Sequence, residues 1–140
     1  MKVLALDHGA ARTGVAVSDE TGTLARPLTV VERVETAAGF ARLLAVVAAE
    51  RPALVVVGLP VSLDGREHGQ ARAARRFAAR LAAAVDVPVV LHDERFTSRI
   101  AEQRGGRAPE DARAAAALLE DYLRAREARG AGPGGEGGGA

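Results

Sequence analysis

Acidic side chains occur at places in the sequence where they could hold a metal ion. Asp7 follows one short apolar run, and Asp93 and Glu94 follow another in the stretch VVLHDERFTS. A carboxylate at the carboxyl end of a buried strand points into the crevice where α/β proteins place their ligands. Side chains alternate along a strand, so Asp93 and Glu94 should diverge, one toward the crevice and one away from it. The residues alone do not say which of the two faces inward.

A third acid, Asp111, lies near the start of the last helix that the pattern predicts. At 3.6 residues per turn, it shares one helix face with Ala115, Leu118 and Tyr122, and this face is apolar. A simpler interpretation is open, because Pro109 near the first helical position puts Asp111 in the first turn, where the helix dipole favours an acid. The dipole does not require the apolar face, so the pattern favours a functional role.

Carboxylates that converge in this way require a cation, because like charges at short range repel and raise one another's pKa. Hard oxygen ligands suit Mg²⁺ or Mn²⁺. Two such ions roughly 4 Å apart can bind the attacking and leaving oxygens of a phosphodiester. We therefore expect two metal ions held by Asp7, by Glu94 or Asp93, and by Asp111.

Other chemistries are poorly supported by the sequence. The loop from Gly9 to Gly14 lacks the Gly-Lys-Ser/Thr ending of a nucleotide-binding phosphate loop, and no zinc-ligand spacing of histidines occurs. Arg72, Arg76 and Arg80 recur every four residues, which is typical of a solvent-exposed helix face, with phosphate contact as the alternative. With three Phe, one Tyr and no Trp, the chain has few aromatic side chains for stacking on bases.

The expected elements follow the order β-β-β-α-β-α-β-α. We expect strands at 3–7, 14–18, within 24–31, 53–60 and 87–92, and helices at 36–50, 70–85, 97–103 (short) and 110–127. The first three strands have short connections and should form an antiparallel meander, whereas the last two are reached by helical crossovers. This order predicts an α/β fold with a mixed five-stranded sheet and helices on both faces. The ribonuclease H-like fold has this architecture, although other α/β sandwiches share the order.

Length and composition narrow the class of protein. The chain of 140 residues should form one domain at 1–129, followed by a disordered glycine-rich tail at 130–140. A net charge of +1 gives no overall field that would favour nucleic acid or membrane. The absence of cysteine excludes disulfides and fits a cytoplasmic protein, and we expect neither a signal peptide nor a membrane span.

Four stretches of the sequence resemble motifs of the YqgF family of Holliday-junction-resolvase-like proteins. These stretches are LALDHGAARTGVAVSD, VVVGLPVSLDG, PVVLHDERFTS and DARAAAALLEDYL, and they span the chain from Leu4 to about Leu123. The resemblance implies a ribonuclease H-like fold and a cytoplasmic nuclease that matures the 5′ end of 16S rRNA during ribosome biogenesis. It also implies that Asp7, Glu94 and Asp111 form the catalytic, metal-binding triad.

The same resemblance marks further positions. It implies that Arg12, Arg95 and Thr97 contact the substrate, and it includes Gly58, Asp64 and Gly65 as further motif positions. Ala11 stands where the family commonly has Lys, which removes one basic group near the site and could weaken RNA binding.

The leading hypothesis is therefore a Mg²⁺- or Mn²⁺-dependent phosphodiesterase that acts on structured RNA, the precursor of 16S rRNA. Partners in ribosome assembly or transcription would fit this role. One alternative is a Holliday junction resolvase that acts on branched DNA and works as a dimer. Another is a non-catalytic module that binds nucleic acid or the transcription machinery. Metal binding that depends on the acids would separate the nucleases from the module.

Overall fold

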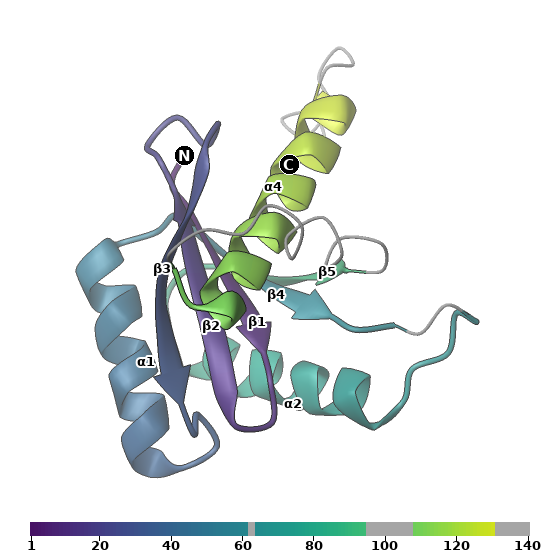
Figure 1. Cartoon of the computed structure of the whole chain (residues 1–140). Helices are drawn as coiled ribbons and strands as arrows, with labels where there is room; N and C mark the ends of the chain where they lie inside the picture. The colour runs from purple at the N-terminus through teal and green to yellow at the C-terminus, as the bar shows by residue number, and fades with distance from the viewer. Residues whose placement is uncertain (62–63, 95–107, 131–140) are drawn as a thin grey trace.

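The computed structural model describes residues 1–61, 64–94 and 108–130 (Figure 1). The elements are β1 (Val3–His8), β2 (Arg12–Ser18), β3 (Ala25–Glu32), α1 (Ala37–Glu50), β4 (Leu54–Leu59), α2 (Gly69–Ala84), β5 (Val89–Asp93) and α4 (Glu110–Gly130). The order β-β-β-α-β-α-β-α expected for these parts of the chain is confirmed. The short helix expected at 97–103 lies outside the described residues, and so does the tail expected at 130–140, except for Gly130, which is the last residue of α4.

The five strands form one mixed sheet in the order β3-β2-β1-β4-β5. β1 lies in the centre, antiparallel to β2 and parallel to β4, and β3 and β5 form the edges. The antiparallel half has short connections, whereas β4 and β5 follow the helical crossovers α1 and α2, as a parallel arrangement requires. The parallel strands β1, β4 and β5 therefore all have their carboxyl ends at one edge of the sheet.

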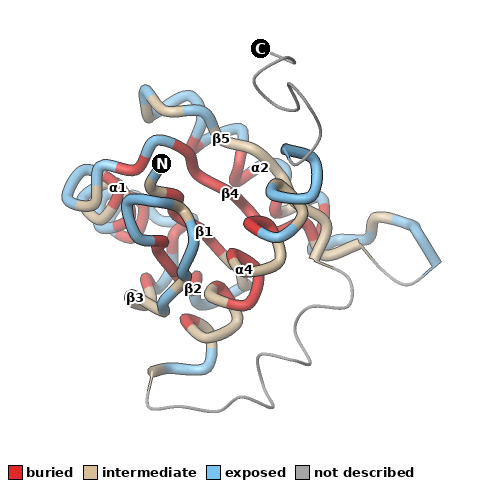
Figure 2. Tube along the Cα trace, turned by 90° about the horizontal axis from the view of Figure 1, so that it is seen from above, coloured by how far each residue is buried: buried red, intermediate tan, exposed pale blue. Residues whose placement is uncertain are grey.

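Alternation along the strands sends side chains to two separate cores. Leu4 and Leu6 of β1 pack on the side covered by α1 and α2, whereas Val3 and Ala5 pack on the side covered by α4 (Figure 1). Figure 2 shows that buried positions run along β1 and β4, as expected for strands that are covered on both faces. Helices on both faces of the sheet are thus confirmed.

Local sequence explains where the helices begin and end. The Oγ1 of Thr36 accepts a hydrogen bond from the backbone N–H of Gly39 at 3.0 Å, so that Thr36 caps α1. α4 continues to Gly130, beyond the end expected at Glu127, and the acids Glu110 and Asp111 occupy its first turn. Within the described residues, no helix is long and apolar enough to cross a membrane.

Candidate active site

Asp7 and Glu94 meet at the edge where the parallel strands end. Asp7 comes two residues after Ala5, which packs on the α4 side of β1, and directly after Leu6, which pairs with Val57 of the neighbouring strand β4. Alternation therefore puts Asp7 on the α4 side, and continuing the register puts it next to Gly58. Glu94 follows β5, and its backbone N–H donates a hydrogen bond to the carbonyl oxygen of Leu59 at 3.2 Å. A Cβ atom on Gly58 would collide with Oε2 of Glu94. The Glu94 carboxyl group therefore lies directly over Gly58, and it forms a hydrogen bond with the Asp7 side chain.

The two carboxyl groups share a proton. Burial raises the pKa of Glu94 to about 8, and the charge of Asp7, the hydrogen bond to it and the charge of Asp93 act in the same direction. Burial also raises the pKa of Asp7, as does the negative charge of Asp111, although the hydrogen bond from Glu94 partly offsets these effects. In the metal-free site at neutral pH, Glu94 is accordingly protonated, and its O–H donates a hydrogen bond to the Asp7 carboxylate.

Gly14 brings the third acid close to this pair. Gly14 of β2 lies directly opposite Asp7 in the β1–β2 ladder. A Cβ atom on Gly14 would collide with the carbonyl oxygen of Asp111, so the backbone of α4 touches β2 at a point that only glycine permits. The sequence predicted that Asp111 projects toward the sheet, and the first turn of α4 does lie against it there.

The Asp111 side chain, however, forms an ion pair with Arg12. Its Oδ2 lies 3.2 Å from the Nε of Arg12, and the two side chains are 42% and 60% exposed, respectively. Within the described part of the chain, no three His, Cys, Asp or Glu side chains lie close enough together to hold a metal ion. Two acids are thus brought together, and the third lies beside them with its carboxylate bound to an arginine.

The donor chemistry nevertheless fits Mg²⁺ or Mn²⁺. Asp7 and Glu94 offer carboxylate oxygens in a largely buried place over a glycine that leaves room for them. A cation there would replace the shared proton. Asp111 would complete the set of ligands if its carboxylate bound the metal ion instead of Arg12. Asp7, Glu94 and Asp111 would therefore be the residues that hold the ion.

Asp93 diverges from Glu94 as the strand pattern predicted. It pairs with Leu59 at the end of β4, and Leu59 packs on the α2 side of the sheet. Glu94 is the acid that lies on the same side as Asp7 and α4. The sequence left this choice open because it depends on the register of β5 against β4.

The remaining motif positions fall into two groups. Arg95 and Thr97, expected to contact the substrate, lie outside the described residues. Gly65 has a φ of 83°, a conformation that glycine adopts readily, and Oδ1 of Asp64 accepts a hydrogen bond from the backbone N–H of Arg66 at 2.9 Å. Asp64 and Gly65 therefore shape a turn.

Sequence reasoning missed a polar contact that anchors the end of β5. Nε2 of His92 lies 2.7 Å from Oδ2 of Asp121 on α4, and the His92 ring packs edge-on against Tyr122 at a centroid distance of 5.4 Å. His92 is half-buried, with 17% of its side chain exposed. Its position two residues before Glu94, on the same side of the strand, is the signal that could have placed it under α4.

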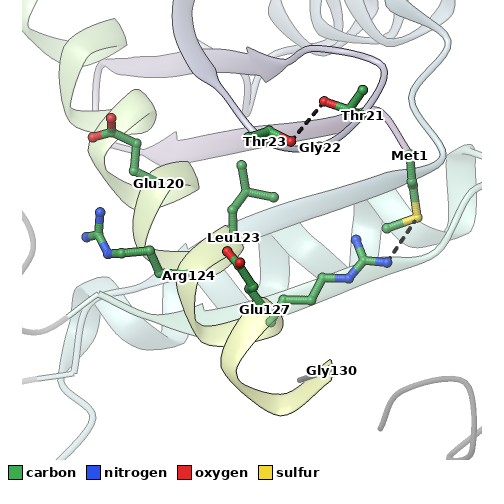
Figure 3. Close-up of a pocket in the computed structure, with 10 residues that line it drawn as sticks. Met1, Thr21, Gly22, Thr23, Glu120, Leu123, Arg124, Glu127 and Gly130 are labelled. Atoms are coloured by element: carbon green, nitrogen blue, oxygen red, sulfur yellow. Dashed lines mark hydrogen bonds between the residues drawn. The ribbon is translucent and has the colours of Figure 1, made fainter. Parts of the chain in front are cut away.

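A separate hollow of about 590 Å³ lies at the other end of α4 (Figure 3). It is formed by the β2–β3 connection at Thr21 and Thr23 and by side chains of α4 that include Glu120, Arg124 and Glu127. Asp7 and Glu94 do not line it, and its charged groups are of mixed sign. The candidate active site is the carboxylate edge instead.

Comparisons with known proteins identify relatives of this chain. Residues 1–125 match the family model described as "RuvX: Holliday junction resolvase". A protein of Anaeromyxobacter sp. (strain Fw109-5) is 42% identical over 137 residues, which cover 91% of this chain and 100% of the relative. A protein of Maridesulfovibrio salexigens is 39% identical over 132 residues, covering 88% and 98%. Both relatives are named "Putative pre-16S rRNA nuclease". The resemblance to the YqgF family is thereby confirmed.

Solved structures confirm the fold. Thermus thermophilus RuvC in complex with a Holliday junction substrate superposes with a TM-score of 0.55 at 24% identity, covering 90% of this chain and 96% of RuvC. The Fowlpox virus resolvase in complex with Holliday junction DNA gives a TM-score of 0.53 at 9% identity, covering 89% and 98%. The expected ribonuclease H-like α/β fold is the observed one.

Proposed function

The chain belongs to the RuvX family, and from this premise we propose that it is a metal-dependent nuclease that cleaves the precursor of 16S rRNA. The observation that carries the proposal is the largely buried, hydrogen-bonded pair of Asp7 and Glu94 at the carboxyl ends of parallel strands. Two carboxyl groups buried together destabilise a fold unless a proton or a cation neutralises them. A module that only binds nucleic acid would gain nothing from such a pair.

Each residue of the site has a defined task in this mechanism. Asp7, Glu94 and Asp111 would hold the cation, Glu94 without its proton and Asp111 without its ion pair to Arg12. When bound, Mg²⁺ or Mn²⁺ would supply a polarised phosphate and a more acidic water molecule. Arg12, no longer paired with Asp111, would donate hydrogen bonds to a phosphate oxygen through its planar guanidinium group. The same side chain would therefore bind Asp111 in the metal-free protein and a phosphate in the substrate complex.

The names of the relatives support an RNA substrate, since those proteins are named after the 16S rRNA precursor. Branched DNA is the second candidate, because the matching family model is described as a Holliday junction resolvase and RuvC with its junction shares the fold. On the first proposal the protein acts in the cytoplasm, beside the ribosome-assembly or transcription machinery.

Cleavage assays on two substrates test the proposal. The purified protein is incubated with precursor 16S rRNA and with four-way junction DNA, in Mg²⁺, in Mn²⁺ and in chelator. We expect cleavage of the RNA that requires a divalent cation, is lost in Asp7→Asn and is retained in Asp86→Asn. Asp86 is an exposed acid at the end of α2 and serves as the matched control. Cleavage by Asp7→Asn, or in excess chelator, would overturn the mechanism, whereas preference for the junction would favour the second candidate.

A further inference from the structure

A second cavity, of about 320 Å³, opens on the α2 side of the sheet next to the end of β1. Its charged and aromatic lining consists of His8, Glu35, Arg76, Phe77 and Arg80. We propose that this cavity binds one unpaired nucleotide of the substrate strand, with the base on His8 and the phosphate on Arg76. The inference rests on the proposed nuclease function and names a part of its substrate that lies beyond the cleavage site.

The cavity adjoins the carboxylate site through the backbone of β1. His8 follows Asp7 directly, and the two side chains point to opposite sides of the sheet, since Asp7 lies on the α4 side and His8 stacks on Phe77 of α2. The turn between β1 and β2 ends the sheet here. A nucleic-acid strand with a phosphate at Asp7 therefore reaches the cavity by passing over this turn.

The base site is an aromatic surface held in place from below. The His8 ring stacks on the buried Phe77 ring with a centroid distance of 4.6 Å and an interplanar angle of 22°. Unpaired bases stack on aromatic rings of this kind in single-strand recognition. The small side chains of Ala10 and Ala73 leave space over the ring.

Two arginines of α2 line the cavity, but only one of them is available to a phosphate. Arg80 is fixed, because its guanidinium carbon lies 3.7 Å from the centroid of the Phe40 ring and its Nη1 donates a hydrogen bond to the carbonyl oxygen of Val34 at 3.0 Å. Arg76 is exposed and makes no ion pair with any other described residue. Its neighbour Arg75, by contrast, binds both carboxylate oxygens of Glu67.

Glu35 sets the orientation of the nucleotide. Its carboxylate repels a phosphate and accepts hydrogen bonds from an exocyclic amine, so the base should lie toward Glu35 and the phosphate toward Arg76. Adenine, cytosine and guanine carry such an amine, whereas uracil does not. A volume of about 320 Å³ is at the lower end of the range for ligand pockets and suits a single nucleotide better than a duplex.

Binding in chelator tests the inference without any cleavage. Fluorescently labelled single-stranded RNA oligonucleotides are titrated with the wild-type protein and with two charge-reversal variants of α2. Arg76→Glu removes the proposed phosphate contact, and Arg72→Glu is the matched control, because it makes the same charge change one turn away and outside the cavity. We expect Arg76→Glu to weaken binding about tenfold and Arg72→Glu to weaken it about threefold or less, since the control lies outside the cavity and, apart from its hydrogen bond to the carbonyl oxygen of Glu67, changes only the general field. Equal effects, or no binding by the wild-type protein, would overturn the inference.

A second measurement tests whether one base of the strand is bound in the cavity and whether a free nucleotide also binds there. One base at a time is removed from the oligonucleotide, and removal at a single position should reduce the affinity of the wild-type protein strongly. It should reduce the affinity of Glu35→Ala less, because only the stacking on His8 is then left to lose. The His8 ring signals in the NMR spectrum should also shift with adenosine monophosphate and not with ribose 5-phosphate if a free nucleotide suffices. A loss spread evenly over all positions, together with unmoved His8 signals, would count against the subsite. Because no step requires hydrolysis, this result is independent of whether the cleavage assays succeed.

Discussion

Arg12 and Asp111 form an ion pair at the rim of the carboxylate site, with Nε 3.2 Å from Oδ2. The pair joins the first residue of β2 to the first turn of α4, and it binds the carboxylate of the third acid beside the hydrogen-bonded pair of Asp7 and Glu94. Because the positive charge of Arg12 lies against the carboxylate that a metal ion would bind, it repels an incoming cation, and Arg12 competes with the cation for Asp111. The first two predictions follow from this competition.

Replacing Asp111 by Asn should barely change the stability of the metal-free protein. The lost ion pair is exposed and contributes about 1 kcal/mol or less, while removal of the negative charge relieves its repulsion with Asp7. Stabilisation by added Mn²⁺ should shrink, because a ligand of the ion is gone. Thermal melts of wild type and Asp111→Asn across a Mn²⁺ titration measure both effects. Parallel stabilisation curves would mean that Asp111 is only an acid at the start of a helix.

Replacing Arg12 by Gln should tighten metal binding and weaken substrate binding. In this variant the Asp111 carboxylate no longer has to give up an ion pair with the Arg12 guanidinium group before it binds metal. We therefore expect the Kd for Mn²⁺, measured by calorimetry, to fall severalfold. KM for RNA should rise, because the guanidinium contact with phosphate is lost. Arg26→Gln, at an exposed position on β3, is the control and should change neither quantity. Weaker metal binding in Arg12→Gln would show that Arg12 helps to shape the metal site rather than compete with it.

The metal-free protein should lose stability as pH rises from about 5 to about 8. The pKa of Glu94 is raised from 4.5 in the unfolded chain to about 8 in the fold, so the folded state keeps a proton that the unfolded state has already released. Between these values the folded state binds more protons, and the free energy of unfolding falls with pH, by an amount on the order of a few kcal/mol. Asp7, whose pKa is also raised, acts in the same direction.

Glu94→Gln isolates this effect, because the amide keeps a hydrogen-bond donor for Asp7 at every pH. Urea unfolding in chelator at pH 5, 6, 7 and 8 should show a clear decline for wild type and a much flatter profile for the variant. Saturating Mn²⁺ should reverse the decline in wild type, since the cation replaces the proton. An equally steep decline in Glu94→Gln would place the titrating group elsewhere.

The sequence predicted the acids of the site more easily than their surroundings. Asp7 and Glu94 follow apolar runs that can only be buried strands, and two crossovers force those strands to end at one edge. The distance between the two carboxyl groups depends on the register of β4 with its neighbours β1 and β5, because this register puts a glycine beneath them. No local sequence pattern reveals that register. The pairing of Arg12 with Asp111 likewise requires the docking of α4 on β2. His92 and Asp121 are 29 positions apart, so that their contact also arises only in the folded chain.

Gly58 offers the sharpest test of the site's geometry. A Cβ atom at this position would collide with Oε2 of Glu94 and would lie 3.0 Å from Cδ2 of Leu118, so Gly58→Ala must push the glutamate away from Asp7. We expect loss of Mn²⁺-dependent stabilisation and of cleavage, with a smaller loss of stability in chelator, because Glu94 lies at the end of a strand and can move outward. Gly69→Ala is the matched control, since nothing lies within 4 Å of its Cβ position at the start of α2. That variant should bind Mn²⁺ as wild type does and be equally or slightly more stable, because alanine is the better helix former. Melting curves of both variants with and without Mn²⁺ decide the matter, and undiminished Mn²⁺ stabilisation of Gly58→Ala would show that Glu94 does not hold the metal where it now lies.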